Sequence, residues 1–190
     1  MLAALLPAAC VTAPPPPPPP PFLAWHGQEP LPAPADDIAY VEQAAASRGH
    51  SLTPSELRYN LISLALRRIE AADGLGYSTA YRDDAGNWFV NVKPPYDRAA
   101  ILALANETVR AELTLREVRF DAQDIERIQQ RLLDAFTGNA DVSMTMYDHL
   151  TDMFVLGVEE DADLDVLRAR IPPDLQPFVR IEPGNTIILV

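Results

Sequence analysis

The spacing of apolar residues divides the chain into a helical part and two parts that alternate strands with helices. Between positions 36 and 72, apolar side chains recur every three or four residues, which is typical of helices that bury one face. We predict a helix over residues 36–47 and a second over 54–72, opened by the capping box Thr53-Pro54-Ser55-Glu56. Residues 36–75 therefore form a helical arm whose apolar side chains pack into a core.

After Gly76 the apolar spacing shortens to two, which indicates strands. Residues 77–81 and 88–92 predict a hairpin, residues 97–110 a helix, residues 113–120 a strand and residues 122–136 a further helix. This part, 76–137, is the first α+β unit together with its connecting helix.

The order strand, strand, helix, strand then recurs over residues 138–190. We predict strands at 142–147 and 153–158, a helix at 164–170 and a closing strand at 178–181. A shift of 65 residues, the difference between positions 78 and 143, pairs four identical residues: Ser78 with Ser143, Asp83 with Asp148, Phe89 with Phe154, and Val90 with Val155. The expected fold class is α+β, with two small antiparallel sheets in ββαβ units joined by a helix.

The first ten residues are apolar and end in small residues before Cys10, the one cysteine of the chain. Leu6, Ala8, Ala9 and Cys10 resemble a bacterial lipobox, although Pro7 replaces the usual aliphatic residue and no basic residue precedes Arg48. A start codon placed too far downstream would explain the missing basic residues. Two interpretations stay open: Cys10 is lipidated, or the N-terminus is unprocessed and its thiol is incidental. The apolar run is too short to span a membrane.

Residues 11–35 form a proline-rich linker. Positions 14–21 are eight consecutive prolines, which favour extended polyproline II of about 25 Å. Such a segment suits a stalk that lifts an exported domain from the cell envelope, or a ligand for an aromatic-lined groove.

Composition excludes several function classes. The 190 residues hold 15 Lys and Arg against 27 Asp and Glu, a net charge of −12 that argues against nucleic acid as a partner. A single cysteine excludes an internal disulfide, a cysteine-based zinc site and a dithiol redox motif. We predict no cofactor.

Candidate chemistry in the folded part has simpler structural explanations. The acidic segment 159–165 lacks the ligand alternation and the glycine of a calcium loop, and its aspartates suit a helix cap. His50 and His149 fall in loops, where we expect them to be exposed and unpartnered. Met144, Met146 and Met153 alternate on the second hairpin; we expect core and cross-strand packing there rather than an adaptable binding face. No carboxylate pair lies among pocket-forming apolar residues, so a hydrolase using surface carboxylates is the least favoured alternative.

Several strings between Gly76 and Pro183 resemble the propeptide of secreted bacterial serine proteases of the α-lytic protease and streptogrisin type. The most specific is Val118-Arg119-Phe120-Asp121-Ala122-Gln123-Asp124-Ile125-Glu126; another is Trp88-Phe89-Val90-Asn91-Val92 before a proline and an alanine-rich helix. The resemblance implies a folding catalyst and tight inhibitor of the protease, whose C-terminal sheet pairs with a protease hairpin and whose last residues enter the substrate cleft. No protease domain follows here, so either role is expected to act in trans.

The tail after Asn185 is apolar and prone to form a strand. Ile187, Ile188, Leu189 and Val190 are candidate partner-binding residues, and the alternative is a last strand of the domain's own sheet. The expected function is a non-enzymatic, exported protein-binding module, in the periplasm or cell envelope, with lipid attachment at Cys10 as one possibility. The more specific alternative is a trans-acting inhibitor or folding chaperone of a secreted serine protease.

Overall fold

The computed structural model describes residues 31–184. Cys10, the proline run and the tail Ile187–Val190 lie outside the described residues. In chain order the elements are η1 (Pro34–Asp36), α1 (Asp37–Ala46), α2 (Pro54–Ala71), β1 (Tyr77–Arg82), β2 (Trp88–Val92), α3 (Arg98–Ala103), α4 (Glu107–Arg110), β3 (Leu113–Glu117), α5 (Ala122–Phe136), β4 (Val142–Asp148), β5 (Met153–Val158), α6 (Leu164–Arg170), η2 (Gln176–Phe178) and β6 (Val179–Pro183).

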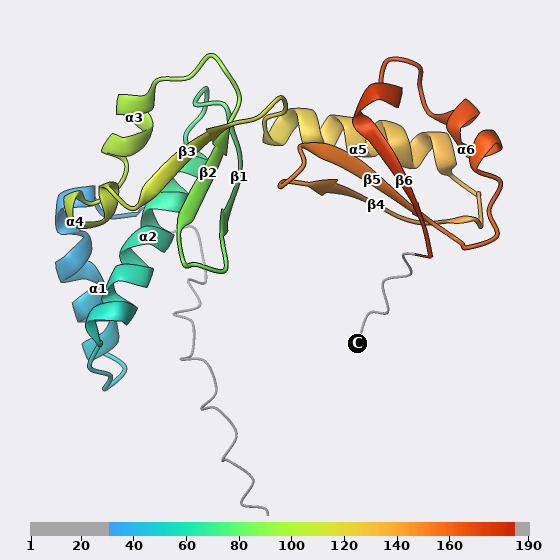
Figure 1. Cartoon of the computed structure of the whole chain (residues 1–190). Helices are drawn as coiled ribbons and strands as arrows, with labels where there is room; N and C mark the ends of the chain where they lie inside the picture. The colour runs from blue at the N-terminus through green and yellow to red at the C-terminus, as the bar shows by residue number, and fades with distance from the viewer. Residues whose placement is uncertain (1–30, 185–190) are drawn as a thin grey trace, which may run out of the picture. The chain divides into compact units, whose positions relative to one another are not determined.

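The α+β fold class with a helical N-terminal arm is confirmed, and each unit contains a three-stranded sheet (Figure 1). The strand orders are β1-β2-β3 and β4-β5-β6. The sheets are mixed rather than antiparallel, because β3 runs parallel to β2 and β6 runs parallel to β5. In each parallel pair the chain passes through helices after the first strand and before the second. Such a crossover connection lets the second strand run in the same direction as the first.

The register of the two sheets corrects the predicted repeat. Phe89 pairs with Thr114 and Phe154 pairs with Val179, so the second and third strands of the units correspond at the predicted shift of 65 residues. The first strands correspond at 66, because Tyr81 faces Phe89 whereas Tyr147 faces Phe154. The turn of the second hairpin is one residue shorter. The matches at Phe89 and Val90 therefore hold, whereas Ser78 with Ser143 and Asp83 with Asp148 are not structural equivalents.

The helical arm packs into the core of the first unit. The capping box of α2 is present, with Glu56 N–H donating to Thr53 Oγ1 at 3.3 Å and Thr53 N–H donating to Glu56 Oε2 at 2.7 Å. Its stripe Leu61, Leu64, Ala65 and Ile69 is fully or almost fully buried, and α2 contacts β1 and α4. The helix predicted over residues 97–110 is divided into α3 and α4, because Asn106 caps a new helix by accepting a hydrogen bond from Thr108 N–H at 3.0 Å.

A buried ion pair fastens the start of the described chain to α2. Arg68 donates to both carboxylate oxygens of Asp37, and Asp37 is completely buried. The same guanidinium donates to Pro32 O at 2.7 and 3.1 Å and to Leu104 O at 3.1 Å. Asn106 Nδ2 donates to Pro34 O at 2.6 Å. The backbone at Pro32 and Pro34 is thus held by interior side chains.

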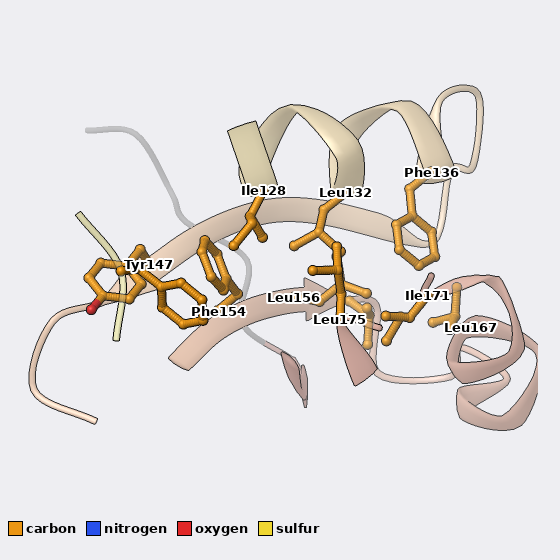
Figure 2. Packing of buried hydrophobic residues seen from close by; sticks show 11 residues of the cluster. Ile128, Leu132, Phe136, Tyr147, Phe154, Leu156, Leu167, Ile171 and Leu175 are labelled. Atoms are coloured by element: carbon orange, nitrogen blue, oxygen red, sulfur yellow. The ribbon is translucent and has the colours of Figure 1, made fainter. Parts of the chain in front are cut away.

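Helix α5 covers one face of the second sheet, and Figure 2 shows its apolar stripe facing that sheet. Ile128, Leu132 and Phe136 point toward Phe154 and Leu156 across this layer. One end of the core is closed by Leu167 of α6 and by Ile171 and Leu175, which come after that helix. None of the described helices has both the length and the apolar character needed to cross a bilayer.

Candidate functional site

The outer edge of β4 is the first feature of the second sheet with binding potential. Asp148 O accepts a hydrogen bond from Asp152 N–H at 2.9 Å, on the side of β4 that faces β5. Because successive residues of a strand direct their backbone groups to opposite edges, the N–H and C=O groups of Thr145 point away from β5. Within residues 31–184 no strand pairs with this edge.

The edge on the other side, formed by β6, is less suited to accept a strand. Gly184 N–H donates to Val158 O of β5 at 2.9 Å, so alternation directs the backbone of Pro183 outward. Proline has no N–H to donate, and proline at an edge position discourages strand addition. The β4 edge is therefore the better template of the two.

The three methionines of the described chain lie on the sheet face opposite α5. Met144 pairs with Gly157, Met146 with Val155, and Met153 with Asp148, whereas the intervening pairs contain Tyr147, Phe154 and Leu156 of the core. We call Met144, Met146, Met153 and Val155 the methionine face. Met146 is 41% exposed, and Met144 and Met153 are half-buried. The three methionines therefore lie outside the core beneath α5, contrary to one half of the expectation, whereas their pairing across β4 and β5 agrees with the expected cross-strand packing.

The turn that follows β4 is held by side chains of the first sheet. Arg116 of β3 donates to His149 O at 3.3 Å and to Leu150 O at 2.7 Å, and Asn91 Nδ2 lies 3.5 Å from His149 O. The His149 ring lies 4.6 Å from the Tyr81 ring, centroid to centroid. His149 is thus half-buried and engaged, not exposed and unpartnered as predicted; His50 also has a partner, with Nε2 3.4 Å from Glu56 Oε1.

Arg119 secures the end of the same turn. Its Nε donates to Asp152 Oδ2 at 2.8 Å, and its guanidinium lies 5.0 Å from the centre of the Phe178 ring. Tyr147 donates its hydroxyl to Asp152 Oδ1 at 2.5 Å; burial, and then this carboxylate, raise the pKa of Tyr147. These contacts hold the turn between β4 and β5 in place through Asp152.

Asp148, the last residue of β4, stabilises the turn internally. Its carboxylate accepts hydrogen bonds from Leu150 N–H at 2.9 Å and from Thr151 Oγ1 at 2.6 Å, and Arg180 Nη2 lies 3.3 Å away. Burial alone would raise the pKa of Asp148, but these hydrogen bonds outweigh it and lower the pKa. The carboxylate therefore stays ionised and keeps the turn closed.

An open hollow of about 430 Å³ lies at the carboxyl ends of β2 and β3, lined by Lys93, Pro94, Glu117, Val118, Arg119 and Asp152. Its cations are already paired: Lys93 contacts Asp124 and lies 3.3 Å from Asp121 Oδ2, and Arg119 contacts Asp152. Burial opposes ionisation of Asp124, but hydrogen bonds from Lys93 and Arg127 outweigh it and lower its pKa. The hollow is best explained as a network of structural ion pairs.

The acidic segment 159–165 takes the capping role expected of it at Asp163, which accepts hydrogen bonds from the N–H groups of Asp165 and Val166 at 3.1 and 3.2 Å. Glu159, Glu160 and Asp161 are exposed and form no ion pair with another described residue. No group of three metal-ligating His, Cys, Asp or Glu side chains occurs within the part of the chain that the structure covers.

Neither a family model nor any of the curated proteins matches this chain. Functional inference therefore rests on the open β4 edge, the methionine face and the charges around them.

Proposed function

We propose that this protein is a non-enzymatic, exported module that binds another protein by adding a strand of that partner to the β4 edge. The single observation that carries the proposal is the outward backbone of Thr145, which lies on an edge without a described partner strand. Strand addition supplies affinity through main-chain hydrogen bonds. The adjacent methionine face supplies adaptable apolar side chains.

A second candidate function is inhibition or folding of a secreted serine protease in trans. It is supported by the two ββαβ units, whose order of elements agrees with the resemblance, and by the capping of α5 by Asp121 within the most specific resembling string. The tail Ile187–Val190 is a further candidate contact with such a partner.

We propose no catalytic role for the carboxylates of the hollow. Asp152 is engaged by Arg119 and Tyr147, and Glu117 Oε1 lies 3.3 Å from the Tyr96 hydroxyl. Catalytic acids and bases typically lie in clefts where burial and a charged partner move the pKa toward the working pH, whereas this hollow is open.

Attachment to the envelope through a lipid would depend on Cys10. Expression with the natural upstream sequence and metabolic labelling with a palmitate analogue tests this, with Cys10→Ser as the control. Equal labelling of the two proteins, or none of either, contradicts lipidation at Cys10.

The second candidate function is tested by incubating the full chain with a panel of secreted chymotrypsin-like serine proteases, measuring both inhibition and recovery of activity during protease refolding. No effect on any protease would refute this candidate and leave strand addition to another kind of protein. We expect Thr145→Pro, which removes an outward N–H, to abolish any effect while preserving the circular dichroism spectrum. Deletion of residues 186–190 separates the roles of the tail. An unchanged partner affinity with a lowered melting temperature would assign the tail to the domain's own sheet.

A further inference from the structure

The chemistry surrounding the β4 edge differs at its two ends, and this difference specifies a partner. The strand comprises seven residues, about 23 Å at 3.3 Å per residue. Its first end adjoins the segment after β5, because Glu159 N–H donates to Asp141 O at 2.9 Å. Its second end is the turn held by arginines.

The first end carries a local excess of negative charge. Asp141, Glu159, Glu160 and Asp161 are exposed, and none of them forms an ion pair with another described residue. The net charge of the whole chain, −12, reinforces this local potential. A basic group placed here gains attraction without having to displace an existing partner.

The second end does not favour a basic group. Arg116, Arg119 and Arg180 lie around the turn, against the carboxylates of Asp148 and Asp152, and Arg180 Nε also donates to Glu182 Oε1 at 2.6 Å. Both carboxylates already accept hydrogen bonds from this part of the molecule. A partner segment therefore meets an acidic end and an arginine-rich end, and the two orientations are not equivalent.

The middle of the strand favours apolar side chains. Met146 is 41% exposed and Met144 is half-buried, and both lie on the methionine face beside the outward backbone of Thr145. Side chains of an added strand alternate between the two faces, so those on this face would contact the two thioethers.

Resting on the proposed function, we infer that the partner segment is an extended polypeptide, apolar on the side facing the methionines and basic at the end that reaches Asp141 and Glu159–Asp161. Antiparallel pairing is the more stable arrangement for an edge strand. In that arrangement the C-terminal end of the partner segment lies at the acidic end of β4. The basic residues are thus the C-terminal ones of the segment.

The test uses fluorescein-labelled peptides of alternating Val and Thr with a pair of Lys at the C-terminal end, and matched peptides with that pair replaced by Glu or moved to the N-terminal end. Binding to the full chain is followed by fluorescence anisotropy. We expect the C-terminal Lys peptide to bind about tenfold more tightly than the Glu peptide, since each exposed ion pair contributes modestly. Equal binding of these two, or no binding of the Lys peptide, overturns the inference.

Protein variants locate the contact. We expect the triple change Glu159→Lys, Glu160→Lys and Asp161→Lys to remove the preference for Lys. The control reverses three exposed acids far along the chain from β4, Glu42 and Asp73 of the helical arm and Asp84 of the first unit, and changes the global charge equally. If both triple variants weaken binding equally, the effect is one of net charge, and the assignment to this end is refuted.

Two further variants separate the partner chemistry from strand addition. Met146→Asp should weaken all peptides, whereas Leu133→Asp, at a residue of α5 that is 50% exposed, should not. One outcome is that Thr145→Pro leaves binding of the Lys peptide intact while the change of Glu159, Glu160 and Asp161 still removes the preference for Lys. That result refutes strand addition but supports the inferred chemistry of the partner. If Thr145→Pro abolishes binding but the change of Glu159, Glu160 and Asp161 has no effect, the proposed function is supported and this inference is refuted.

Discussion

The buried pair of Arg68 and Asp37 gives the sharpest stability prediction for the fold. Arg68 is 8% exposed and Asp37 is 0% exposed, so removal of one partner leaves the other charge buried without compensation. Such losses are about 3–5 kcal/mol. Arg68→Met also deprives the carbonyl groups of Pro32 and Leu104 of their donors. We therefore expect its cost at the upper end, about 5 kcal/mol.

Asp37→Asn should cost less than Arg68→Met. The substituted side chain keeps its shape and one oxygen acceptor, and the guanidinium retains its contacts with Pro32 O and Leu104 O. We expect a loss of about 2–3 kcal/mol. In the double variant Asp37→Leu with Arg68→Met neither charge is left unpaired, so its loss should be smaller than the sum of the losses in the single variants Asp37→Leu and Arg68→Met.

Urea unfolding followed by circular dichroism measures these losses, with Arg67→Met as the matched control because Arg67 is the neighbouring, more exposed arginine of α2. A domain of ordinary stability, about 5–15 kcal/mol, would lose a large fraction of it in Arg68→Met. A loss below about 1 kcal/mol in that variant, or strictly additive losses in the double variant, would refute the reasoning.

Two further predictions concern α5. Leu132→Ala should destabilise the protein by about 2–5 kcal/mol, because Leu132 is completely buried, whereas Leu133→Ala should have little effect in the same urea titration; similar losses would contradict the packing of α5. The pKa of Asp124 is lowered in the folded state, so its ionised form stabilises the fold above the unfolded-state value of 3.8, and this contribution disappears as the pH falls through the folded-state pKa. Asp124→Asn should therefore lower stability at neutral pH and reduce the further loss below pH 3.8, and parallel pH profiles of variant and wild type would argue against it.

Local patterns predicted the elements well where each element depends on its own residues. The capping box at Thr53 acts within one helix and occurs as expected, and α5 has the predicted bounds, residues 122–136. The break between α3 and α4 was missed because the apolar spacing continues through Asn106, whose side chain starts a second helix while binding Pro34 O.

Contacts between residues far apart in the sequence have no local pattern from which they could be predicted. Arg119 belongs to a string that resembles the propeptide, but nothing in that string indicates its partner Asp152, 33 positions away. The methionines alternate as a half-buried strand does, but alternation does not reveal which face a helix will cover. The direction of the third strands was missed for a related reason, since parallel and antiparallel partners have the same period of two.

The fastening at Pro32 and Pro34 has a mechanical consequence. A chain pulled from its N-terminal side transmits the load first to the segment that Arg68 and Asn106 hold, before it reaches any strand of either sheet. The hydrogen bonds of Arg68 and Asn106 to Pro32 O and Pro34 O must therefore break before the chain can be peeled from α2 starting at that end.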